Sequence, residues 1–530
     1  MSKPNALLAR TQQSAYAKAK ARVALLQAIE AATPVAPIAP VAPVSPVAPI
    51  APLAPSALLA PAAGASHQAA SHQTASSPPT ARPPSPLERE CLQLFLANEF
   101  AQVVHKVRLS AASSASEVTA KLLLIHGVCL RRLELNDEAY ATFRALASRV
   151  NELATENQLD VLDGLTACAT AAGQPTAASH YGKQAIEARM QVFTTPPLAW
   201  ADDWREQLAS AQVAAQAGLK VLSYSLYGHK PVYTEMLLMN LSAAQVLYPG
   251  WQVWVYVDGT VPAQVRVRLQ AGGARVIEVS AADQKLPGTM WRFLAVEDPA
   301  VEIAAFRDAD SYLTPREVAC VSAWLAAGTA VHAMRDWFTH SELMLAGMSG
   351  VRAAGFRRLR EALNYFVARP FTPSHGDQHF LRKHLWPYAQ HSVTVHDTVF
   401  APRGSVPVPQ AGAPTLAAHI GNRLSRHVRF DVSHLVGEKA VEKVGEQAGE
   451  QADQKLGDSL KSVPASVPVS VPALLPTLLP VTLRLLAGTH CLGTYDYVAK
   501  GGVVTVELPN VLDDLRKAGQ FNVEWVHAAA

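Results

Sequence analysis

The stretch Ala304-Ala305-Phe306-Arg307-Asp308-Ala309-Asp310-Ser311-Tyr312-Leu313 organises the middle of this chain. Apolar residues lead into two carboxylates, Asp308 and Asp310, that stand two positions apart. Alternate side chains of an extended segment point to the same side, so a strand ending here would present both acids together. Two neighbouring carboxylates both stay ionised at low cost only when a cation lies between them. The pattern predicts a hard divalent ion that holds diphosphate oxygens, whereas the plain alternative is a polar loop after a strand.

Strand and helix patterns alternate ahead of this stretch. Runs rich in β-branched and aromatic residues predict strands, and apolar residues at helical spacing predict helices between them. We expect strands at 219–225, 253–257, 275–279 and 303–306, and helices at 233–247, 264–271 and 291–297. Such alternation is typical of a mostly parallel sheet, whose sites lie at the carboxyl ends of its strands. The fold class predicted for residues 215–432 is therefore α/β.

Length and composition narrow the class of protein. With 530 residues the chain has room for two or three domains. Its formal net charge of +3 is too balanced to indicate nucleic acid or a membrane surface as a partner. The 5 cysteines are scattered and include no C-x-x-C pair, which indicates reduced thiols. No window of about eighteen uninterrupted apolar residues is present. We expect a cytoplasmic protein without a transmembrane segment and without a nucleic-acid partner.

Two proline-rich stretches divide the chain. Residues 1–85 combine a possible helix at 5–32 with a proline at every third position from Pro34 to Pro55. The fixed backbone angle and missing N–H of proline favour polyproline II there. Residues 433–480 are rich first in charge and then again in proline. Both stretches are expected to be disordered linkers.

The last fifty residues, 481–530, form a separate unit. Their pattern predicts strands at 481–486, 503–508 and 522–526 and a helix at 511–518. This is a small α+β module whose sequence indicates no chemistry. An interaction or assembly role is the default expectation.

Helical periodicity fills residues 86–200, and it repeats. Ala101, Ala139 and Ala177 are spaced by 38 residues. Other small or aromatic residues recur at similar offsets, namely Gly127, Gly164, Phe143 and Tyr181. Small residues at fixed offsets let paired helices approach closely. The pattern resembles degenerate tetratricopeptide repeats, with an ordinary helical bundle as the alternative. Repeats of this kind imply a possible protein partner, and we expect them to serve acceptor choice or partner docking.

Six short motifs between residues 219 and 430 carry polar chemistry. They are, in order, Ser225-Leu226-Tyr227-Gly228, Trp291-Arg292-Phe293, the pair Asp308 and Asp310, the small-residue loop 345–350 around Gly347, Gly376-Asp377-Gln378, and His419-Ile420-Gly421-Asn422-Arg423. A nucleobase could stack on Tyr227, and the guanidinium of Arg292 suits diphosphate geometry. A glycine such as Gly347 lets a sugar ring approach the backbone.

In this order the motifs resemble those of GT-A-fold glycosyltransferases, most nearly glycosyltransferase family 8, which includes glycogenin and lipopolysaccharide galactosyltransferases. The resemblance implies a Rossmann-like GT-A domain and a nucleotide-sugar donor. It implies Asp308, Asp310 and His419 as ligands of Mn²⁺ (or Mg²⁺), and Asp377 and Gln378 as groups that face the transferred sugar. The donor-binding residues on this interpretation are Ser225, Tyr227, Asp258, Arg292, Gly347, Gly421 and Arg423.

One segment departs from the family pattern. The family spaces its late histidine, glycine and lysine as H-x-x-G-x-x-K, whereas this chain has H-x-G from His419, with Arg423 or Arg426 as the nearby cation. His396 is therefore a rival third metal ligand. Asp336, which lies between the aspartate pair and the glycine loop, is the next active-site carboxylate and could act as a general base.

The predicted function is metal-dependent transfer of a hexose from a nucleotide diphosphate sugar to an unknown glycan, lipid-linked or protein acceptor. A metal bound to both phosphates would neutralise charge on the leaving diphosphate. Asp377 and Gln378 would stabilise the oxocarbenium-like sugar. The resemblance to family 8 implies retention of configuration. One alternative is a non-catalytic scaffold, and another is a haloacid-dehalogenase-type phosphohydrolase, which also has a D-x-D after a buried strand.

Overall fold

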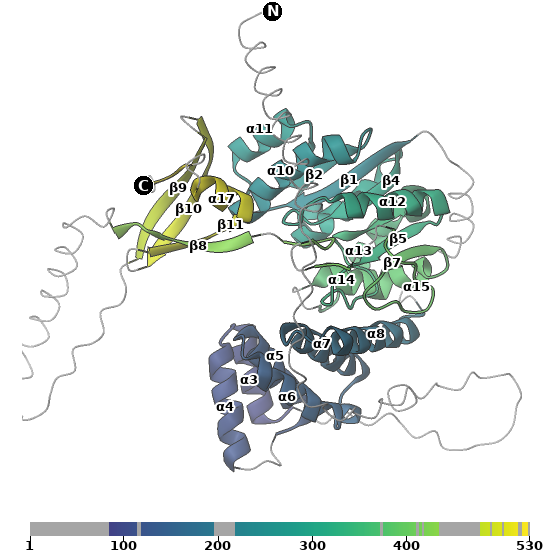
Figure 1. Ribbon diagram of the computed structural model, residues 1–530, viewed down its shortest axis with the longest axis vertical. Helices are drawn as coiled ribbons and strands as arrows, with labels where there is room; N and C mark the ends of the chain where they lie inside the picture. Colours follow the sequence, from purple (N-terminus) through teal and green to yellow (C-terminus); the bar gives the residue numbers. More distant parts are fainter. Residues whose placement is uncertain are drawn as a thin grey trace, which may run out of the picture.

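The computed structural model describes residues 84–113, 118–195, 218–371, 375–409, 413–415, 418–423, 425–433, 478–487, 490–500, 503–517 and 522–527. These residues form a helical domain, an α/β domain and a C-terminal sheet (Figure 1). The expected helix at 5–32 and nearly all of both proline-rich linkers lie outside the described residues. No helix in the described ranges is long and apolar enough to cross a membrane.

The helical domain is a chain of helices in which each one packs on the next. Its first helix begins with a capping box. The Ser85 hydroxyl accepts a hydrogen bond from the Glu88 N–H, and the Glu88 carboxylate accepts one from the Ser85 N–H. The helices are α3 (Pro86–Leu96), α4 (Phe100–Ser113), α5 (Ala120–Arg132), α6 (Asn136–Ala147), α7 (Thr155–Ala171) and α8 (Pro175–Val192), with a short turn of 3₁₀ helix, η2 (Val150–Glu152).

The ring of Phe143 on α6 lies between two glycines of the neighbouring helices. A Cβ atom on Gly127 of α5 would come within 2.9 Å of this ring, and one on Gly164 of α7 would overlap it. Both helices therefore approach α6 over a residue without a side chain. The close approach predicted from the recurring small residues is confirmed at these two positions. The assignment to tetratricopeptide repeats stays a prediction.

Seven of the described strands form one mixed sheet in the order β3-β2-β1-β4-β6-β5-β7. All neighbours are parallel except β6, which runs antiparallel to β4 and β5. The bounds are β1 (Leu219–Leu226), β2 (Gln252–Val257), β3 (Arg275–Glu278), β4 (Val301–Arg307), β5 (Val331–Arg335), β6 (Met348–Arg352) and β7 (Val393–Asp397). The first four confirm the strands expected from the sequence. A mostly parallel sheet with helices on both faces is consistent with a Rossmann-like GT-A fold.

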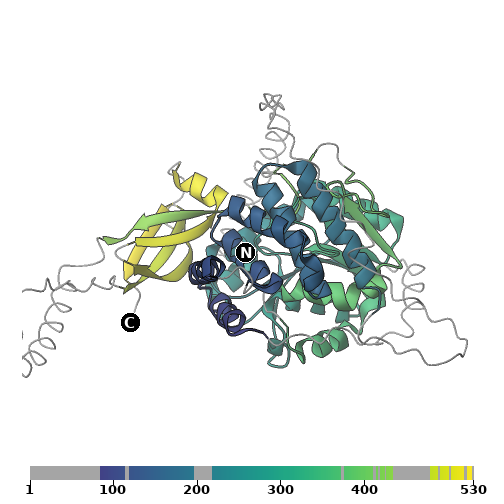
Figure 2. The same cartoon turned by 90° about the horizontal axis from the view of Figure 1, so that it is seen from below.

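Helices cover both faces of this sheet. On one face, α10 (Pro231–Leu247), α11 (Ala263–Ala271) and α12 (Pro315–Ala327) share an apolar core with the strands. The other face carries η4 (Gly288–Glu297, a 3₁₀ helix), η5 (Ala353–Phe356), α13 (Leu359–Val367), α14 (Gly376–Phe380), η6 (Leu381–Leu385, a π-helix) and α15 (Trp386–Ala389). The core of this second face also contains Leu159, Ile186 and Phe193 of the helical domain. Figure 2 shows the helical domain lying across the α/β domain.

The chain changes the direction in which strands are added at β1. It builds β2 and β3 to one side of β1 and then places β4 on the other side, so that Leu226 pairs with Val257 and Tyr224 with Arg307. In open α/β sheets such a switch point opens a crevice beyond the carboxyl ends of the two central strands. Asp308 follows β4 at this edge, and Tyr227 follows β1.

The C-terminal sheet differs from the module that the sequence predicts. Its strand order is β12-β9-β10-β11-β8, with antiparallel pairs of β9 with β10 and β12, and of β11 with β8 and β10. The elements are β8 (Ser425–Asp431), β9 (Leu478–Ala487), β10 (His490–Lys500), β11 (Val503–Pro509), α17 (Asn510–Lys517) and β12 (Asn522–His527). The sequence interpretation missed β10. It also assigned residues 425–431 to the α/β domain, whereas they pair with β11.

This sheet is docked on the α/β domain through a buried polar contact. The Tyr495 hydroxyl donates to Glu235 of α10 at 2.5 Å. The same carboxylate accepts two hydrogen bonds from Arg268 of α11, at 2.6 and 2.8 Å. Tyr495 is 1% exposed and Glu235 is 4% exposed. Because a buried carboxylate needs such partners, the contact fixes the sheet against these two helices.

Candidate functional site

Two serines of β1 fix the segment that carries Arg292. The Ser223 hydroxyl donates to the Arg292 carbonyl at 2.7 Å, and the Ser225 hydroxyl accepts from the Arg292 N–H at 2.9 Å. Both serines are buried. Ser225, which the sequence suggested as a donor-binding residue, therefore contacts the backbone of η4 at the end of β1. The two hydrogen bonds fix the backbone position of Arg292 relative to β1.

The Arg292 guanidinium joins two of the predicted acids. It is 3% exposed and donates to Asp308 Oδ1 at 2.5 Å and to Asp377 Oδ2 at 2.7 Å. It also donates to the carbonyls of Arg307 and Thr289, at 2.8 and 3.0 Å. Arg292, Asp308 and Asp377 come from three separate motifs of the sequence. The structure brings them together around one buried cation.

Gly347 stands directly against the exposed side of Asp308. The Asp308 side chain is 43% exposed. A Cβ atom on Gly347 would overlap its carboxylate, so any other residue there would displace the acid or the loop. The predicted glycine loop and the predicted acid are therefore neighbours.

Asp310 is the more enclosed member of the aspartate pair. Its side chain is 18% exposed, and its Oδ2 lies 3.4 Å from Nε of Arg423. Burial, together with the charge of Asp308, raises the pKa of Asp310 to about 6, although Arg423 opposes the shift. Arg423 also pairs with Glu507 of β11 and lies 5.5 Å from the ring centre of Tyr233. Glu507, from the C-terminal sheet, thus reaches the edge of the site.

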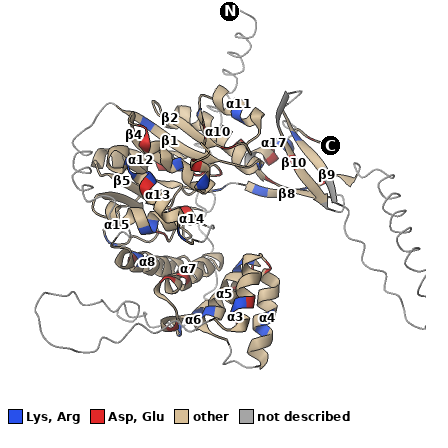
Figure 3. Cartoon of the chain, turned by 180° about the vertical axis from the view of Figure 1, so that it is seen from behind, with Lys and Arg blue, Asp and Glu red and all other residues tan. Residues whose placement is uncertain are grey.

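The charges of this group do not balance. Basic and acidic residues are interspersed over all three units (Figure 3), and most buried acids have one arginine each. Here two guanidiniums, Arg292 and Arg423, contact four carboxylates, namely Asp308, Asp310, Asp377 and Glu507. Two negative charges remain, which one divalent cation would balance. Carboxylate oxygens are also the ligands that Mg²⁺ and Mn²⁺ accept, so Asp308 and Asp310 fit such an ion.

The third predicted metal ligand, His419, does not join the aspartates in a metal-binding group. Among the described residues, no three His, Cys, Asp or Glu side chains converge on a point that could hold a metal. The His419 ring stacks on Trp337, with ring centres 4.8 Å apart, and its Nδ1 lies 2.9 Å from the Thr415 carbonyl. The rival, His396, is 1% exposed and its Nδ1 lies 2.8 Å from Nε2 of His332. Burial lowers the pKa of His396 to about 4.

Asp336 has a different environment from the one a general base needs. It is fully buried, and Arg316 donates to both of its oxygens, at 2.7 and 2.8 Å. The N–H of Ile420 donates to the same carboxylate at 3.0 Å. These three donors occupy both carboxylate oxygens, as is typical of a structural acid. In this geometry Asp336 anchors the segment that contains His419 and Gly421.

The remaining predicted donor residues lie around the ends of β1 and β2. Tyr227 is 45% exposed and packs edge-on against Trp291, with ring centres 5.8 Å apart. Asp258 accepts hydrogen bonds from the N–H and hydroxyl of Thr260, and that hydroxyl accepts from the Gly228 N–H at 2.6 Å. The loops after both strands are therefore tied together beside an exposed aromatic ring.

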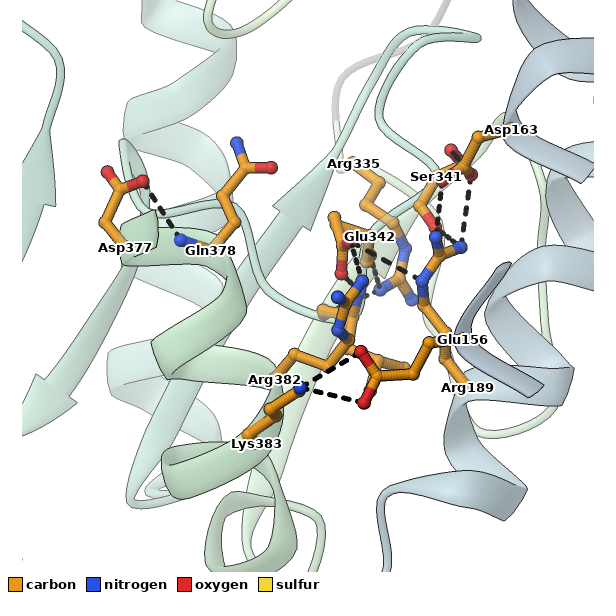
Figure 4. A network of polar contacts seen from close by, with 11 residues as sticks. Glu156, Asp163, Arg189, Arg335, Ser341, Glu342, Asp377, Gln378, Arg382 and Lys383 are labelled. Atoms are coloured by element: carbon orange, nitrogen blue, oxygen red, sulfur yellow. Dashed lines mark hydrogen bonds and ion pairs between the residues drawn. The ribbon is translucent and has the colours of Figure 1, made fainter. Parts of the chain in front are cut away.

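The last predicted motif lies against the loop after β4. The Gly421 carbonyl accepts from the Ser311 hydroxyl at 3.2 Å, and the glycine has a φ of 77°. A Cβ there would come within 2.6 Å of the Met348 sulfur. Gln378 is partly buried, and its N–H donates to Asp377 Oδ1 at 3.0 Å. Figure 4 shows the Gln378 and Asp377 side chains at the start of α14, to one side of the network around Arg189 and Glu342.

Sequence reasoning missed Glu507 and Tyr233 as neighbours of the site. Glu507 lies in a module that carries no recognisable motif, and Tyr233 lies inside an ordinary helix pattern. No local signal separates either from a surface residue, because each reaches the site only through tertiary packing. Arg423, which contacts both Asp310 and Glu507, connects Glu507 to the site, but this contact is visible only in the folded structure.

Comparisons with known proteins add little beyond this geometry. No family model matches the chain, and no curated protein matches it. Among solved structures, the chain is similar to glucosyl-3-phosphoglycerate synthase from Mycobacterium tuberculosis in complex with Mg²⁺ and uridine diphosphate. The sequence identity is 17%, the TM-score is 0.20, and the match covers 30% of this chain and 63% of that one. The match spans less than two thirds of that protein and is too weak to support an argument about function.

Proposed function

We propose that the α/β domain is a metal-dependent glycosyltransferase of the GT-A type that uses a nucleotide diphosphate sugar. The observation that carries the proposal is the unbalanced carboxylate group at the switch point of the sheet, beside a buried arginine and an exposed tyrosine. A site that holds a metal ion needs negatively charged ligands to attract the ion. Its carboxylates therefore outnumber the nearby cations when neither metal nor diphosphate is bound. Sheets with this strand order offer a crevice for a nucleotide at the same edge.

Asp308 and Asp310 are the proposed protein ligands of Mn²⁺ or Mg²⁺. Ions of this kind are commonly held by one or two carboxylates together with substrate phosphates, so a third protein ligand is not required. When bound, the ion would neutralise charge that develops on the leaving diphosphate. This version of the site does without His419, whose ring packs on Trp337.

The other residues have roles that follow from their contacts. Arg292 holds the Asp308 and Asp377 carboxylates in fixed orientations, and Tyr227 offers its face to the nucleobase. Asp377 and Gln378 are the proposed sugar-facing groups, since Arg292 joins Asp377 to the proposed metal ligand Asp308. Retention of configuration is a further part of the proposal and rests on the resemblance to family 8. Repeats that recruit an acceptor or a partner protein are another part, and they rest on the separate resemblance of residues 86–200 to tetratricopeptide repeats.

The direct test is the melting temperature of the full chain with UDP or GDP, with and without Mn²⁺. A ligand present at about one hundred times its dissociation constant stabilises the folded state by about 2.7 kcal/mol. We expect a rise that requires both nucleotide and Mn²⁺. The Asp308→Asn/Asp310→Asn double variant should lose the rise, while Glu278→Gln, which removes an exposed carboxylate at the same edge of the sheet, should keep it. Absence of any shift in the wild type would refute the proposal.

A non-catalytic scaffold is the second candidate, and one observation favours it. Both aspartates of the pair already contact an arginine, so the site is partly neutralised without a metal. A scaffold in which these arginines take the place of the metal would bind nucleotide equally well without Mn²⁺. The metal-free arm of the melting experiment therefore separates the two candidates.

A further inference from the structure

One buried arginine of α8 joins the helical domain to the α/β domain. Arg189 has no exposed surface, and its guanidinium donates to both oxygens of Asp163 on α7, at 3.2 and 2.5 Å. The same group crosses the domain boundary. It donates to the Ser341 carbonyl at 3.1 Å, and its Nε lies 3.4 Å from Glu342 Oε1 (Figure 4).

Glu342, which Arg189 contacts, also binds two elements of the α/β domain. Its Oε1 accepts from Arg382 of η6 at 2.6 Å, and its carbonyl accepts from Arg335 of β5 at 3.0 Å. A second ion pair joins the same helix to the helical domain, because Lys383 Nζ lies 2.8 Å from Glu156 of α7. The loop that carries Ser341 and Glu342, and the helical run that contains η6, are therefore both fixed by α7 and α8.

Each of the two elements leads to Asp308. The loop 336–347 runs from the anchored Ser341 and Glu342 to Gly347, which stands against the Asp308 carboxylate. The helical run α14–η6 contains Arg382 and begins at Gly376-Asp377, and Asp377 shares Arg292 with Asp308. The path from Ser341 to Gly347 is about six residues of loop, and the path from Asp377 to Arg382 is less than about two turns of helix.

The domain boundary around Arg189 is also apolar and closely packed. Ile186 and Phe193 of the helical domain belong to the same buried core as Phe380 and Leu385. A Cβ atom on Gly182 would overlap the Phe400 ring, so α8 approaches the α/β domain over a glycine. An interface of this kind holds the two domains in a fixed arrangement, because packed interiors transmit displacement instead of absorbing it.

From these contacts we propose that Arg189 is a positioning residue for the candidate site, and that the helical domain is part of the catalytic unit. Arg189 sets the loop before Gly347 and the helix after Asp377, and through them the arrangement of Asp308 and Asp377. The inference rests on the proposed function for its consequence, although not for its geometry. It replaces the expectation that the helical repeats serve only acceptor choice or partner docking.

The test uses the full chain with three substitutions. Arg189→Met removes the charge and the hydrogen bonds, and Arg189→Lys keeps the charge. Arg108→Met breaks an exposed arginine–glutamate pair inside the helical domain and is the matched control. The first readout is hydrogen exchange of peptides that cover 341–348 and 376–385, without ligand. We expect faster exchange of both in Arg189→Met, partial rescue in Arg189→Lys and no change in Arg108→Met. Wild-type exchange of both segments in Arg189→Met would overturn the proposal.

The second readout is the dissociation constant of UDP with Mn²⁺, measured by calorimetry. We expect Arg189→Met to raise it about tenfold, which corresponds to about 1.4 kcal/mol, and Arg108→Met to leave it unchanged. Faster exchange with unaltered UDP affinity would show that the anchor does not bear on the donor site, and would also overturn the proposal. GDP replaces UDP in this measurement if it is the nucleotide that stabilises the wild type. A wild type that binds neither UDP nor GDP refutes the proposed function instead, and the exchange data then decide the positioning claim alone. Should Arg189→Met not fold, Asp163→Asn weakens the same anchor and replaces it.

Discussion

Two parallel strands of the central sheet end in the same dipeptide sequence, Arg-Asp. β4 ends in Arg307 followed by Asp308, and β5 ends in Arg335 followed by Asp336. Asp336 is fully buried with a bidentate arginine of its own, whereas the Asp308 side chain is 43% exposed and shares its arginine with Asp377. A strand-end aspartate is therefore not a site by itself. The balance of charge around it separates a structural acid from a functional one.

The arginine of each dipeptide pairs with one buried acid from another element. Arg307 pairs with Glu317 and Arg335 pairs with Asp397, and all four side chains are at most 4% exposed. Breaking such a pair by removing one partner leaves a buried charge uncompensated. Natural proteins keep unmatched charge mainly where function requires it, at a cost in stability. This contrast between matched and unmatched charge yields four predictions.

The largest effect should come from Asp336→Ala. It leaves Arg316 buried without a partner and also frees the Ile420 N–H, so we expect a loss of about 3–5 kcal/mol in the free energy of unfolding. Asp308→Ala should cost below about 1 kcal/mol, because water can replace the exposed Asp308 carboxylate while Arg292 keeps Asp377. Denaturant unfolding followed by circular dichroism measures both. Equal losses would show that Asp308 is a structural acid too.

The next effect concerns the buried His396, whose folded-state pKa of about 4 lies below its unfolded value of about 6.5. Above pH 6.5 both states are neutral and the group does not affect stability. As the pH falls below 6.5, the unfolded state takes up a proton that the folded state refuses. Stability should then fall by about 2–3 kcal/mol down to pH 4.5. The melting temperature of His396→Gln should fall less steeply between pH 6.5 and 4.5 than that of the wild type. Parallel curves would contradict the lowered pKa of His396.

Asp310 should behave in the opposite way. Its folded-state pKa of about 6 lies above the unfolded value of about 3.9, so protonation favours the folded state. That contribution is complete below pH 3.9 and is lost as the pH rises through 6. Asp310→Asn should therefore stabilise the protein at pH 7.5, by at most about 3 kcal/mol, and change little at pH 3.5. Melting temperatures at the two pH values provide the check. A loss of stability at pH 7.5 would mean that Arg423 already balances this acid.

The smallest effect is expected for an exposed pair on α13. Arg358 and Glu361 are 48% and 51% exposed, and water screens their attraction. Glu361→Gln should change the free energy of unfolding by less than about 0.5 kcal/mol. The comparison with Asp336→Ala isolates burial, since both substitutions remove one acid from a short arginine pair. A change above about 1 kcal/mol would show that burial does not control the worth of these pairs.

The sequence predicts the part of the fold that local patterns control. The strands β1 to β4 and the helices between them have unbroken apolar runs or helical spacing, and the glycines around Phe143 predict close packing. The grouping of Arg292, Asp308, Asp377 and Gly347 was expected from the order of the motifs and the family resemblance. The parallel strands explain only the position of Asp308, which follows β4 at the carboxyl edge of the sheet.

The rest depends on contacts between segments far apart in the sequence. His419 has the right residue type for a metal ligand, yet stacking on Trp337 and the contact with the Thr415 carbonyl account for its orientation. Strand β8 reads Ser-Arg-His-Val-Arg-Phe-Asp and has few apolar residues, so its pattern is weak without its partner β11. The Arg189 anchor joins residues 152 positions apart, and no window of sequence contains both ends.

Strand β8 has a consequence for the order in which the protein is made. It leaves the α/β domain directly after Arg423, but its partner β11 begins at Val503, so the ribosome must add about eighty residues before the two can pair. At about 5–20 residues per second this takes several seconds. During that interval Arg423 lacks Glu507, its partner on β11, although it can already reach Asp310. The edge of the site is therefore completed last, and a chain interrupted before β11 carries an assembled sheet with an unfinished site.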